Sequence, residues 1–276
     1  MAQRIALVTG ANKGIGFAIV RALCKQLDNG IVYLTARNEE RGREAVARLN
    51  QEGLQPKYHQ LDVTDRVSVK KLRDFLKETH GGLDVLVNNA GIPFKRSSPD
   101  SFGTQASVVM ATNFTALLEV SRALIPLVRS HGRIVNMAST VGRHVYSEMS
   151  EEVKGRFQAI KTEQDVELLM KEFLEHANAG DHMRKGWPNS AYGTSKMGVI
   201  ALTRVQAADV TKDKTKEDVL LTCCCPGYVA TDLTDHKGPL TVEEGAVTPV
   251  FCALLPPGSK DLNGKMLYQK SVLDFW

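Results

Sequence analysis

The feature that most constrains this chain is a regular alternation of short apolar segments with longer amphipathic ones. The short segments are rich in β-branched residues and apolar throughout, which is typical of strands covered on both faces. The expected strands are Ile5–Val8, Ile31–Thr35, Lys57–Leu61, Val85–Val87, Arg133–Met137, Val219–Cys225 and Lys265–Tyr268. The expected helices are Ile15–Leu27, Glu39–Gln51, Val67–Thr79, Gln105–Val128 and Ala191–Val210. Such repetition predicts right-handed crossovers and an α/β fold with a doubly wound, parallel, seven-stranded sheet.

One stretch interrupts this alternation. About fifty residues without a predicted strand separate Arg133–Met137 from Ala191–Val210. Within it, apolar residues recur at helical spacing in two places. They are Val153, Phe157 and Ile160 in the first, and Val166, Leu169, Met170, Phe173 and Leu174 in the second. We therefore expect a single domain over residues 1–276 with two helices inserted at about 145–186; the alternative is a solvated surface decoration.

Composition excludes several classes of protein. The chain has 35 Lys and Arg against 31 Asp and Glu, and a net charge of +4 is too small to indicate nucleic-acid binding. Three of the five cysteines are consecutive (Cys223, Cys224, Cys225), which fits neither a disulfide framework nor a zinc site, so no metal is expected. No signal-peptide, lipidation or ~20-residue membrane segment is apparent. We expect a cytoplasmic protein in a reducing compartment that binds neither nucleic acid nor membrane.

The segment after the first strand predicts a phosphate-binding turn. It reads Thr9-Gly10-Ala11-Asn12-Lys13-Gly14-Ile15-Gly16 and leads directly into the first helix. Gly10 permits a sharp turn, Gly14 lets the backbone approach a pyrophosphate, and Gly16 allows close packing of helix on sheet. The helix N-terminus supplies N–H donors to the phosphates. Glycine triplets also occur in ordinary loops, but the strand–turn–helix context favours a dinucleotide.

The end of the second strand indicates which dinucleotide binds. NAD specificity usually requires a carboxylate about 20 residues beyond the glycines. Here Leu34-Thr35-Ala36-Arg37 contains none and ends in Arg37. The guanidinium of Arg37 can bind a 2′-phosphate, and Lys13 can add a second charge. This pattern favours NADPH over NADH; the alternative is that both cations are solvated.

Tyr192 and Lys196 are candidate catalytic residues. Their i, i+4 spacing at the start of a helix places the phenol and the ammonium on one face. A free tyrosine titrates near ~10, and we expect the Lys196 ammonium to lower the pKa of the Tyr192 phenol. Ser139 follows the strand Arg133–Met137, where its hydroxyl can hold a carbonyl oxygen beside Tyr192. Taken alone, the Tyr/Lys pair is equally compatible with an exposed helix face.

These motifs occur together and in order. They are Thr9-Gly10-x3-Gly14-x-Gly16, Asn88-Asn89-Ala90-Gly91, Asn113, Ser139, Tyr192-x3-Lys196 and Pro226-Gly227 with Thr231. In this the chain resembles the short-chain dehydrogenase/reductase family, which implies a Rossmann-type fold. The resemblance implies a catalytic tetrad of Asn113, Ser139, Tyr192 and Lys196. It further implies that the dinucleotide is bound by Gly10, Asn12, Lys13, Gly14, Ile15, Gly16, Arg37, Asp62, Val63, Asn89, Ala90, Gly91, Tyr192, Lys196, Pro226, Gly227, Val229 and Thr231.

The long separation of Ser139 and Tyr192 points to a subgroup. Tyr192 lies 53 residues after Ser139, far more than in compact members of the family. This insertion, with Gly186-Trp187-Pro188 and Cys224-Cys225-Pro226-Gly227-Tyr228, is similar to the monomeric NADPH-dependent carbonyl reductases. In such proteins the inserted helices cover the face that relatives use for dimerisation, so the resemblance implies a monomer.

The resemblance implies hydride transfer from NADPH to a small ketone, aldehyde or quinone, with Tyr192 as general acid. Asn113 would help to hold a water chain. The residues expected to contact the substrate are Ser139, Thr140, Val141, Tyr192, Tyr228, Cys225 and Gln105, together with Phe94. Tyr228 stands where the subgroup usually has tryptophan. Two alternatives stay open: a specialist ketone reductase or alcohol dehydrogenase acting on a steroid, prostaglandin or terpenoid, and a non-catalytic NADPH-binding regulatory protein.

Overall fold

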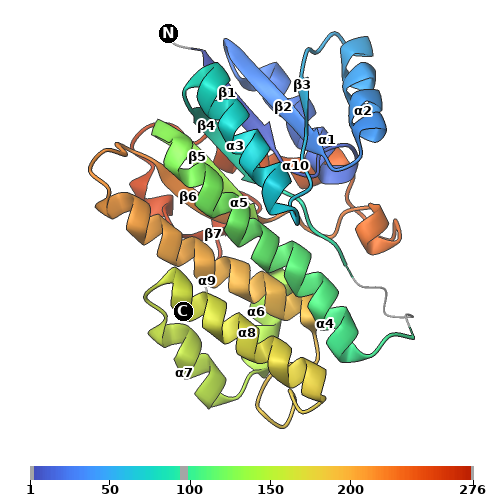
Figure 1. Ribbon diagram of the computed structural model, residues 1–276, viewed down its shortest axis with the longest axis vertical. Coiled ribbons are helices and arrows are strands. Elements are labelled where there is room, and N and C mark those ends of the chain that lie inside the picture. The colour runs from blue at the N-terminus through green and yellow to red at the C-terminus, as the bar shows by residue number, and fades with distance from the viewer. Residues whose placement is uncertain (1–2, 94–98, 275–276) are drawn as a thin grey trace.

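The seven predicted parallel strands form one sheet in the computed structural model, which describes residues 3–93 and 99–274 (Figure 1). The strand order is β3-β2-β1-β4-β5-β6-β7-β8, and the crossover between β3 and β4 produces the doubly wound arrangement. The strands are β1 (Arg4–Val8), β2 (Gly30–Ala36), β3 (Lys57–Gln60), β4 (Leu83–Asn88), β5 (Val128–Met137), β6 (Leu220–Cys225), β7 (Met266–Tyr268) and β8 (Ser271–Val272). The two-residue β8, which pairs antiparallel with β7, adds an edge strand beyond the predicted seven.

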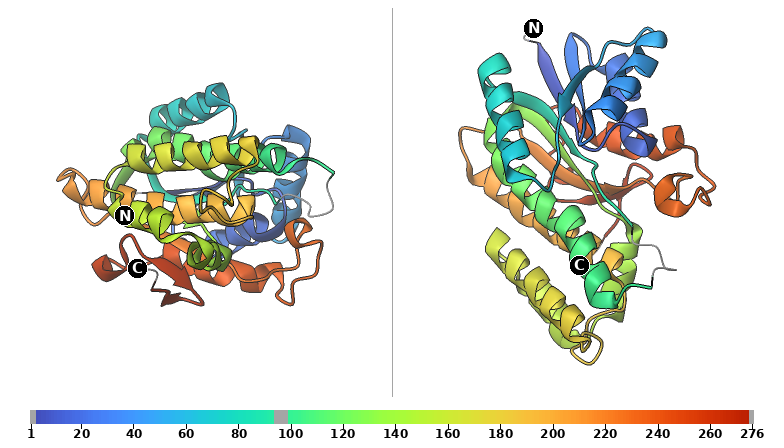
Figure 2. Two further views of the ribbon diagram at one scale, coloured as in Figure 1. Left: turned by 90° about the horizontal axis from the view of Figure 1, so that it is seen from below. Right: turned by 45° about the vertical axis from the view of Figure 1, so that its right-hand side comes forward.

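The apolar strands are covered on both faces because alternate side chains point to opposite sides of the sheet. In β1, Ala6 and Val8 belong to the core beneath α1 (Gly14–Gln26), α2 (Glu39–Gln51) and α10 (Val242–Ala253). Ile5 and Leu7 belong to the core beneath α3 (Arg66–His80), α5 (Ala116–Leu124) and α9 (Ala191–Lys212). Figure 2 shows helices on both sides of the sheet. The predicted α/β class is confirmed.

Two helices were not predicted from the sequence. Helix α6 (Thr140–Glu148) directly follows Ser139 and packs on α9. Helix α10 begins with a capping box in which the side chains of Thr241 and Glu244 bind each other's backbone N–H groups. Pro249 lies inside α10, and because proline usually ends a helix, the sequence pattern did not predict a helix there.

The expected helix Gln105–Val128 is not one continuous α-helix. It consists of α4 (Phe102–Met110), a π-helical turn at Ala111–Thr115, α5, and a 3₁₀ turn at Ile125–Leu127. Two further 3₁₀ turns lie at Asp232–Thr234 and Lys260–Leu262. The π turn contains Asn113, and such turns are frequent at functional sites.

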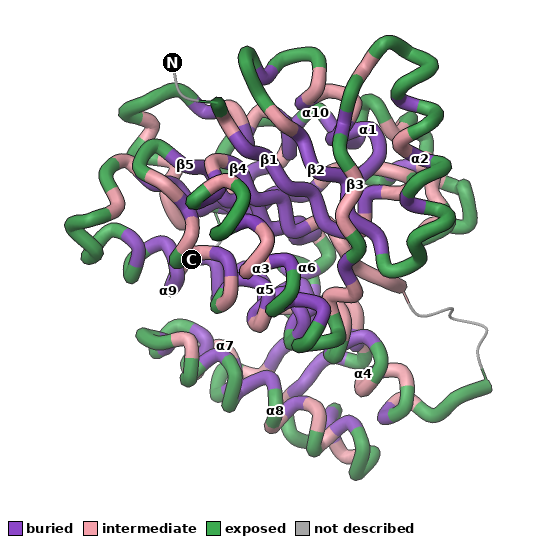
Figure 3. The backbone as a smooth tube through the Cα atoms, turned by 45° about the horizontal axis from the view of Figure 1, so that its top comes forward, coloured by how far each residue is buried: buried purple, intermediate pink, exposed green. Residues whose placement is uncertain are grey.

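The two helices predicted between β5 and α9 are confirmed as α7 (Glu151–Ala159) and α8 (Glu163–Ala179). Helix α8 packs against α4 and α9, and Figure 3 shows exposed residues along the outer side of α7 and α8. Phe157, Phe173 and Trp187 are buried in the same core as residues of α4 and α9. Since burying each such side chain contributes about 1.5–3 kcal/mol, these helices are part of the packed core rather than a surface decoration.

The run Phe102–Leu127 revises one expectation. Over its 26 residues it is long and apolar enough, by length and composition, to cross a membrane, although the sequence analysis expected no such stretch. More than half of its most apolar window is buried inside the protein. Ala106, Val109, Phe114 and Leu117 lie in the core shared with α8 and α9, so this run is a core helix of the fold.

Candidate active site

The predicted site residues gather at one edge of the sheet because the strands that carry them are parallel. Residues 9–16 follow β1, Arg37 follows β2, and Asp62 follows β3. Asn89–Gly91 follow β4, Ser139 follows β5, and Pro226–Thr231 follow β6. Carboxyl ends of neighbouring parallel strands lie at the same edge, which is where ligands bind in doubly wound sheets.

The glycine turn after β1 has the predicted backbone geometry. Gly10 and Gly14 have φ values of 61° and 59°, in the left-handed region that favours glycine. A Cβ at Gly16 would lie 2.5 Å from Nδ2 of Asn89, so only glycine fits there. That amide donates to the carbonyls of Thr9 (2.9 Å) and Gly10 (3.1 Å). Asn89 therefore fixes the turn from the adjacent strand β4.

Helix α1 begins without a side-chain cap. Its N-cap residue, Lys13, makes no capping hydrogen bond, whereas side chains cap α2, α3, α4, α6, α7, α8, α9 and α10. Ile15 lies half-buried in the first turn of α1, and Asn12 is half-buried in the turn before it. The first amides of a helix need an acceptor, and an anion supplies one. An uncapped first turn with glycines on its approach fits the pyrophosphate of a dinucleotide.

Two cations lie near this turn. Arg37 is exposed at the end of β2, and no hydrogen bond or ion pair of its guanidinium is found among residues 3–93 and 99–274. Lys13 forms an ion pair with Asp232, whose other carboxylate oxygen is 2.9 Å from Nε2 of His236. Both cations are accessible to a phosphate, although Lys13 must exchange one anionic partner for another.

The residues expected beside the adenine follow β3. Oδ1 of Asp62 accepts hydrogen bonds from the backbone N–H (2.9 Å) and hydroxyl (2.6 Å) of Thr64. The Thr64 hydroxyl, followed by its N–H and the charge of Arg37, lowers the pKa of the Asp62 carboxyl despite partial burial. Val63, in the loop after β3, and Ala90, in the segment after β4, line a common hollow. This arrangement suits an anionic Asp62 that accepts from an amino group.

Ser139 and Tyr192, both predicted to be catalytic, lie next to each other. Ser139 is the N-cap of α6 and accepts a hydrogen bond from the N–H of Val141 at 3.2 Å. Tyr192 lies in the first turn of α9, and its hydroxyl is hydrogen-bonded to the Ser139 side chain. A carbonyl oxygen placed between these two hydroxyls would receive two hydrogen bonds.

Burial dominates the titration of this site. It raises the pKa of Tyr192 to about 12, although the hydrogen bond with Ser139 opposes the shift. Burial lowers the pKa of Lys196 to about 8. The expected lowering of the Tyr192 pKa by Lys196 is therefore not found. The Lys196 ammonium lies 5.7 Å from the Tyr192 ring centre and donates instead to the Met137 carbonyl at 2.7 Å.

Asn113 connects the π turn to the segment that follows β4. Its Nδ2 donates to the carbonyl of Ile92 (2.9 Å) and its Oδ1 accepts from the N–H of Ile92 (2.8 Å). A Cβ on Gly91 would lie 3.3 Å from Oδ1 of Asn113 and 3.6 Å from Nζ of Lys196. Asn113 and Lys196 thus meet across Gly91, as the tetrad requires.

The segment after β6 borders the glycine turn. Gly227 has a φ of 90°, and a Cβ on Gly14 would lie 3.5 Å from Cγ2 of Thr231. Pro226 is half-buried next to it, and Val229 is buried and bridges to Leu240. Residues 226–231 therefore form the wall of the site opposite Asn89–Gly91.

The expected substrate residues are only partly brought together. The Cys225 thiol lies 3.8 Å from Oγ1 of Thr140, next to Ser139, and Tyr228 and Val141 are 54% and 38% exposed. Gln105 lies in α4, where its amide donates to the carbonyl of Asp100 at 2.9 Å. Phe94 lies outside the described residues. Cys223 and Cys224 are fully buried in the sheet.

Some contacts of the site were not predicted. The Thr9 hydroxyl accepts from the N–H groups of Asn89 and Ala90, both at 3.0 Å, and joins β1 to β4. The Ile92 backbone holds Asn113, and Asp232 holds Lys13. Contacts made by backbone atoms cannot be predicted from residue type, because every residue carries the same backbone groups. Asp232 directly follows Thr231, a residue already predicted to bind the dinucleotide, so its place in the sequence was a signal for it.

A separate cavity of about 530 Å³ lies at the opposite edge of the sheet. It is lined by Gln3, Ile5, Thr79, His80, Asp84, Arg129 and Ser130. Its guanidinium, Arg129, is already paired with Asp84 at 2.8 Å. None of the predicted site residues lines this cavity, so the candidate site is the edge described above.

Comparison with known families decides the classification. The family model described as short chain dehydrogenase matches residues 4–151 and 178–239. The chain belongs to the short-chain dehydrogenase family. The stretch between the two matches contains most of α7 and most of α8, so these helices lie largely outside the part that the family model matches.

Related proteins narrow the comparison. Carbonyl reductase [NADPH] 3 from Rattus norvegicus is 49% identical over 271 residues, 98% of each chain. Carbonyl reductase [NADPH] 1 from Homo sapiens is 46% identical over 269 residues, 97% of each chain. Among solved structures, salutaridine reductase from Papaver somniferum has a TM-score of 0.83 at 31% identity, covering 96% of this chain and 99% of that one. Menthone neomenthol reductase from Mentha piperita has a TM-score of 0.79 at 32% identity, covering 96% and 98%. The predicted family and carbonyl reductase resemblance are confirmed.

Proposed function

We propose that this chain is an NADPH-dependent carbonyl reductase. The observation that carries the proposal is the hydrogen-bonded pair of Ser139 and Tyr192, with buried Lys196 beside it, at the same sheet edge as the uncapped start of α1. Relatives named as NADPH carbonyl reductases, similar over nearly the full chain, support it. The exposed guanidinium of Arg37 and the absence of a carboxylate at the end of β2 favour NADPH over NADH.

The chain's own groups supply the proton chemistry. NADPH, when bound, supplies the hydride. Ser139 and Tyr192 donate hydrogen bonds to the carbonyl oxygen, where negative charge develops. With a pKa of about 12, the Tyr192 hydroxyl stays protonated at neutral pH and transfers its proton to that oxygen. Lys196, held by the Met137 carbonyl, places a positive charge near the phenolate that results.

The site entrance favours apolar carbonyl compounds. Tyr228 and Val141 are exposed apolar side chains in the two segments that the Cys225–Thr140 contact joins. Exposed aromatic and aliphatic groups beside a few hydrogen-bond donors are typical of small-molecule sites. We infer that ketones, aldehydes and quinones with apolar bodies are substrates.

The test is a kinetic panel with the purified protein. Loss of NADPH absorbance after addition of menadione, an aldehyde, a ketosteroid or a prostaglandin measures turnover, and NADH serves as the matched cofactor. Turnover with several carbonyl compounds and a preference for NADPH is the expected result. One dominant ketone would support the specialist reductase, and no turnover would support the regulatory protein. The names of the relatives do not favour either alternative.

We also propose a cytoplasmic monomer. The supporting observation is that α8 covers α4 and α9. Light scattering after size-exclusion chromatography should give a mass near 30.3 kDa, whereas twice that value at micromolar protein would contradict the proposal. Cell fractionation with an antibody tests the compartment, and recovery in a membrane or organelle fraction would contradict it.

A further inference from the structure

A buried histidine lies between the insertion and the active site. His182, in the segment between α8 and α9, is 6% exposed. Its imidazole stacks on the ring of Phe102, with centres 4.1 Å apart and planes 11° apart. Its Nε2 is 3.1 Å from Oδ1 of Asn189. His182 therefore contacts two other segments at once.

Both of those segments lead directly to the site. Asn189 precedes Ser190, whose side chain caps α9 by accepting from the N–H of Gly193 at 3.1 Å. Tyr192 lies within that capped turn. Because the phenol sits so near the helix start, a shift of the cap displaces its hydroxyl relative to Ser139.

The second segment is the start of α4. Phe102 is the first residue of α4, and the same helical run leads to Asn113 in the π turn. His182 thus connects the helix that carries Asn113 to the helix that carries Tyr192. Asn113 also contacts α9 directly, through a 3.3 Å hydrogen bond from its Nδ2 to Oγ of Ser195.

The choice of histidine has a cost that packing alone does not explain. For its Nε2 to donate to the Asn189 oxygen, His182 must leave Nδ1 as an acceptor, and Nδ1 is buried without a partner in the part of the chain that the structure describes. An unsatisfied buried acceptor costs about 1–3 kcal/mol, and an aromatic hydrocarbon of similar shape would avoid this. A phenylalanine would stack equally well on Phe102. The hydrogen bond to Asn189 is the contact that only the imidazole supplies.

We propose that His182 is a positioning residue for the proton transfer. Its bond to Asn189 sets the start of α9, and hence the Tyr192 hydroxyl, while its stack on Phe102 ties that position to α4. This inference rests on the proposed reductase function for its kinetic readout. It assigns the inserted segment a role in catalysis in addition to its packing role.

The experiment compares five variants with the wild-type protein: four single variants and the double variant His182→Phe/Asn189→Ala. His182→Phe keeps the stack and removes the bond to Asn189, Asn189→Ala removes the same bond from the other side, and His182→Gln restores a planar donor. His176→Phe is the matched control, because His176, in the last turn of α8, interacts with Asp181 at 2.8 Å, outside the contacts of His182 with Phe102 and Asn189. The measurements are kcat, KM for menadione and the dissociation constant of NADPH.

Misplacing a reacting group by 1 Å can cost ~10²-fold in rate, so a smaller shift should cost about tenfold. We expect His182→Phe and Asn189→Ala each to lower kcat about tenfold and the double variant to lower it no further. NADPH affinity should stay within about twofold, since the glycine turn is remote, and His182→Gln should recover most of kcat. His176→Phe should behave as wild type.

Three results would overturn the proposal: an unchanged kcat in folded His182→Phe, additive losses in the double variant, or no recovery with glutamine. Thermal melts and amide exchange separate positioning from unfolding. In His182→Phe, exchange should rise at the start of α9 and not at residues 10–16. If the wild type itself did not oxidise NADPH, the reductase function would fail, and the exchange data would still decide whether His182 holds the start of α9.

Discussion

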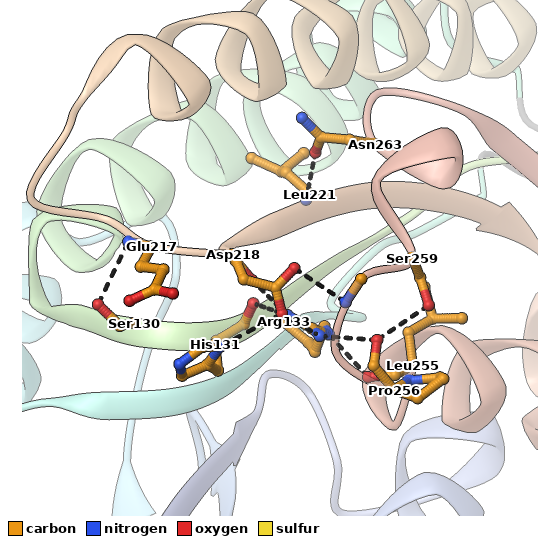
Figure 4. A network of polar contacts seen from close by, with 12 residues as sticks. Ser130, His131, Arg133, Glu217, Asp218, Leu221, Leu255, Pro256, Ser259 and Asn263 are labelled. Atoms are coloured by element: carbon orange, nitrogen blue, oxygen red, sulfur yellow. Dashed lines mark hydrogen bonds and ion pairs between the residues drawn. The ribbon is translucent and has the colours of Figure 1, made fainter.

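The amino and carboxyl ends of the parallel strands differ in how their hydrogen-bond donors are used. At the amino end, Arg133 is 2% exposed and uses all five guanidinium N–H groups (Figure 4). They reach the carbonyls of Gly132, Asp218, Leu255 and Pro256 and the carboxylate of Asp218. At the carboxyl end, α1 starts without a side-chain cap, and the Arg37 guanidinium makes no hydrogen bond or ion pair among the described residues.

This difference indicates that the amino end stabilises the fold and that the carboxyl end binds ligands. A buried donor without a partner costs free energy, so a region whose donors are all satisfied can hold the fold together but has nothing left for a ligand. Donors left open at an exposed turn cost less, because water satisfies them until an anion arrives. We therefore expect changes at the carboxyl end to alter turnover and affinity, and changes at the amino end to alter unfolding.

The largest expected effect is at the Ser139–Tyr192 pair. Tyr192→Phe removes the proton donor, and general acid catalysis contributes ~10²–10⁴-fold, so kcat should fall at least a hundredfold. NADPH affinity, measured by fluorescence titration, should stay within about twofold. Tyr33→Phe is the control. It removes the hydroxyl of a tyrosine on β2 that is hydrogen-bonded to His80, and it should keep full turnover. More than a tenth of wild-type kcat in Tyr192→Phe would rule out its assigned role.

The next largest effect is at the amino end. Arg133→Met leaves the Asp218 carboxylate, whose side chain is 7% exposed, without its cation. Breaking a buried pair in this way costs about 3–5 kcal/mol of unfolding free energy. Urea denaturation measures it, with Arg122→Met as the control for a more exposed cation with three carboxylate partners. An equal loss of unfolding free energy in the two variants, or weaker NADPH binding by folded Arg133→Met, would contradict the inference that the amino end serves stability and the carboxyl end serves binding.

A smaller effect is expected for the open cation. Arg37→Ala removes a charged donor worth about 1.5–3 kcal/mol to a phosphate, so the dissociation constant of NADPH should rise roughly ten- to a hundredfold. That of NADH, which lacks the 2′-phosphate, should not change. Arg43→Ala, whose guanidinium pairs with Glu39 on α2, serves as the control. An equal loss for both cofactors would contradict the role of Arg37.

The burial of Lys196 should make the stability of the protein depend on pH. Its pKa is lowered from 10.5 to about 8, chiefly by burial, so between these pH values the unfolded chain binds a proton that the folded protein does not. The unfolding free energy therefore rises with pH in this window, by at most ~1.4 kcal/mol per pH unit. The difference between wild type and Lys196→Met should grow in favour of wild type by about 2 kcal/mol from pH 8 to pH 10. Lys212 is an exposed lysine, so the difference in unfolding free energy between wild type and Lys212→Met should not change with pH. A difference for Lys196→Met that is also constant with pH would contradict the burial effect.

The smallest effect concerns Asp232. Asp232→Asn removes the carboxylate that pairs with Lys13, and exposed pairs are weak, so NADPH affinity should increase only about two- to threefold. The gain should be larger for NADPH than for NADH. Asp209→Asn, which breaks the exposed pair with Lys212, should change neither affinity. A weaker NADPH affinity in Asp232→Asn would show that Asp232 assists binding.

Much of the fold followed from local patterns. Strands such as Ile5–Val8 are apolar throughout, and the glycine turn 10–16 follows the first of them, so the sheet, its winding and the phosphate site could be predicted. Helices α7 and α8 were predictable because their apolar spacing is regular. Helix α6 was missed because it is short and contains Gly142, and its place depends on contact with α9.

The candidate catalytic residues could be predicted from the sequence: residue type and spacing pointed to Ser139, Tyr192 and Lys196, and the family resemblance added Asn113. Their electrostatics depended on three-dimensional packing. The sequence places Lys196 four residues from Tyr192 and suggests that the charge lowers the phenol's pKa. In the folded protein both groups are desolvated, the ammonium binds Met137, and the phenol's pKa rises to about 12. The same holds for His182, whose partners come from α4 and from the start of α9. Proximity along a helix is local, whereas burial and hydrogen-bond partners are set by segments far apart in the chain.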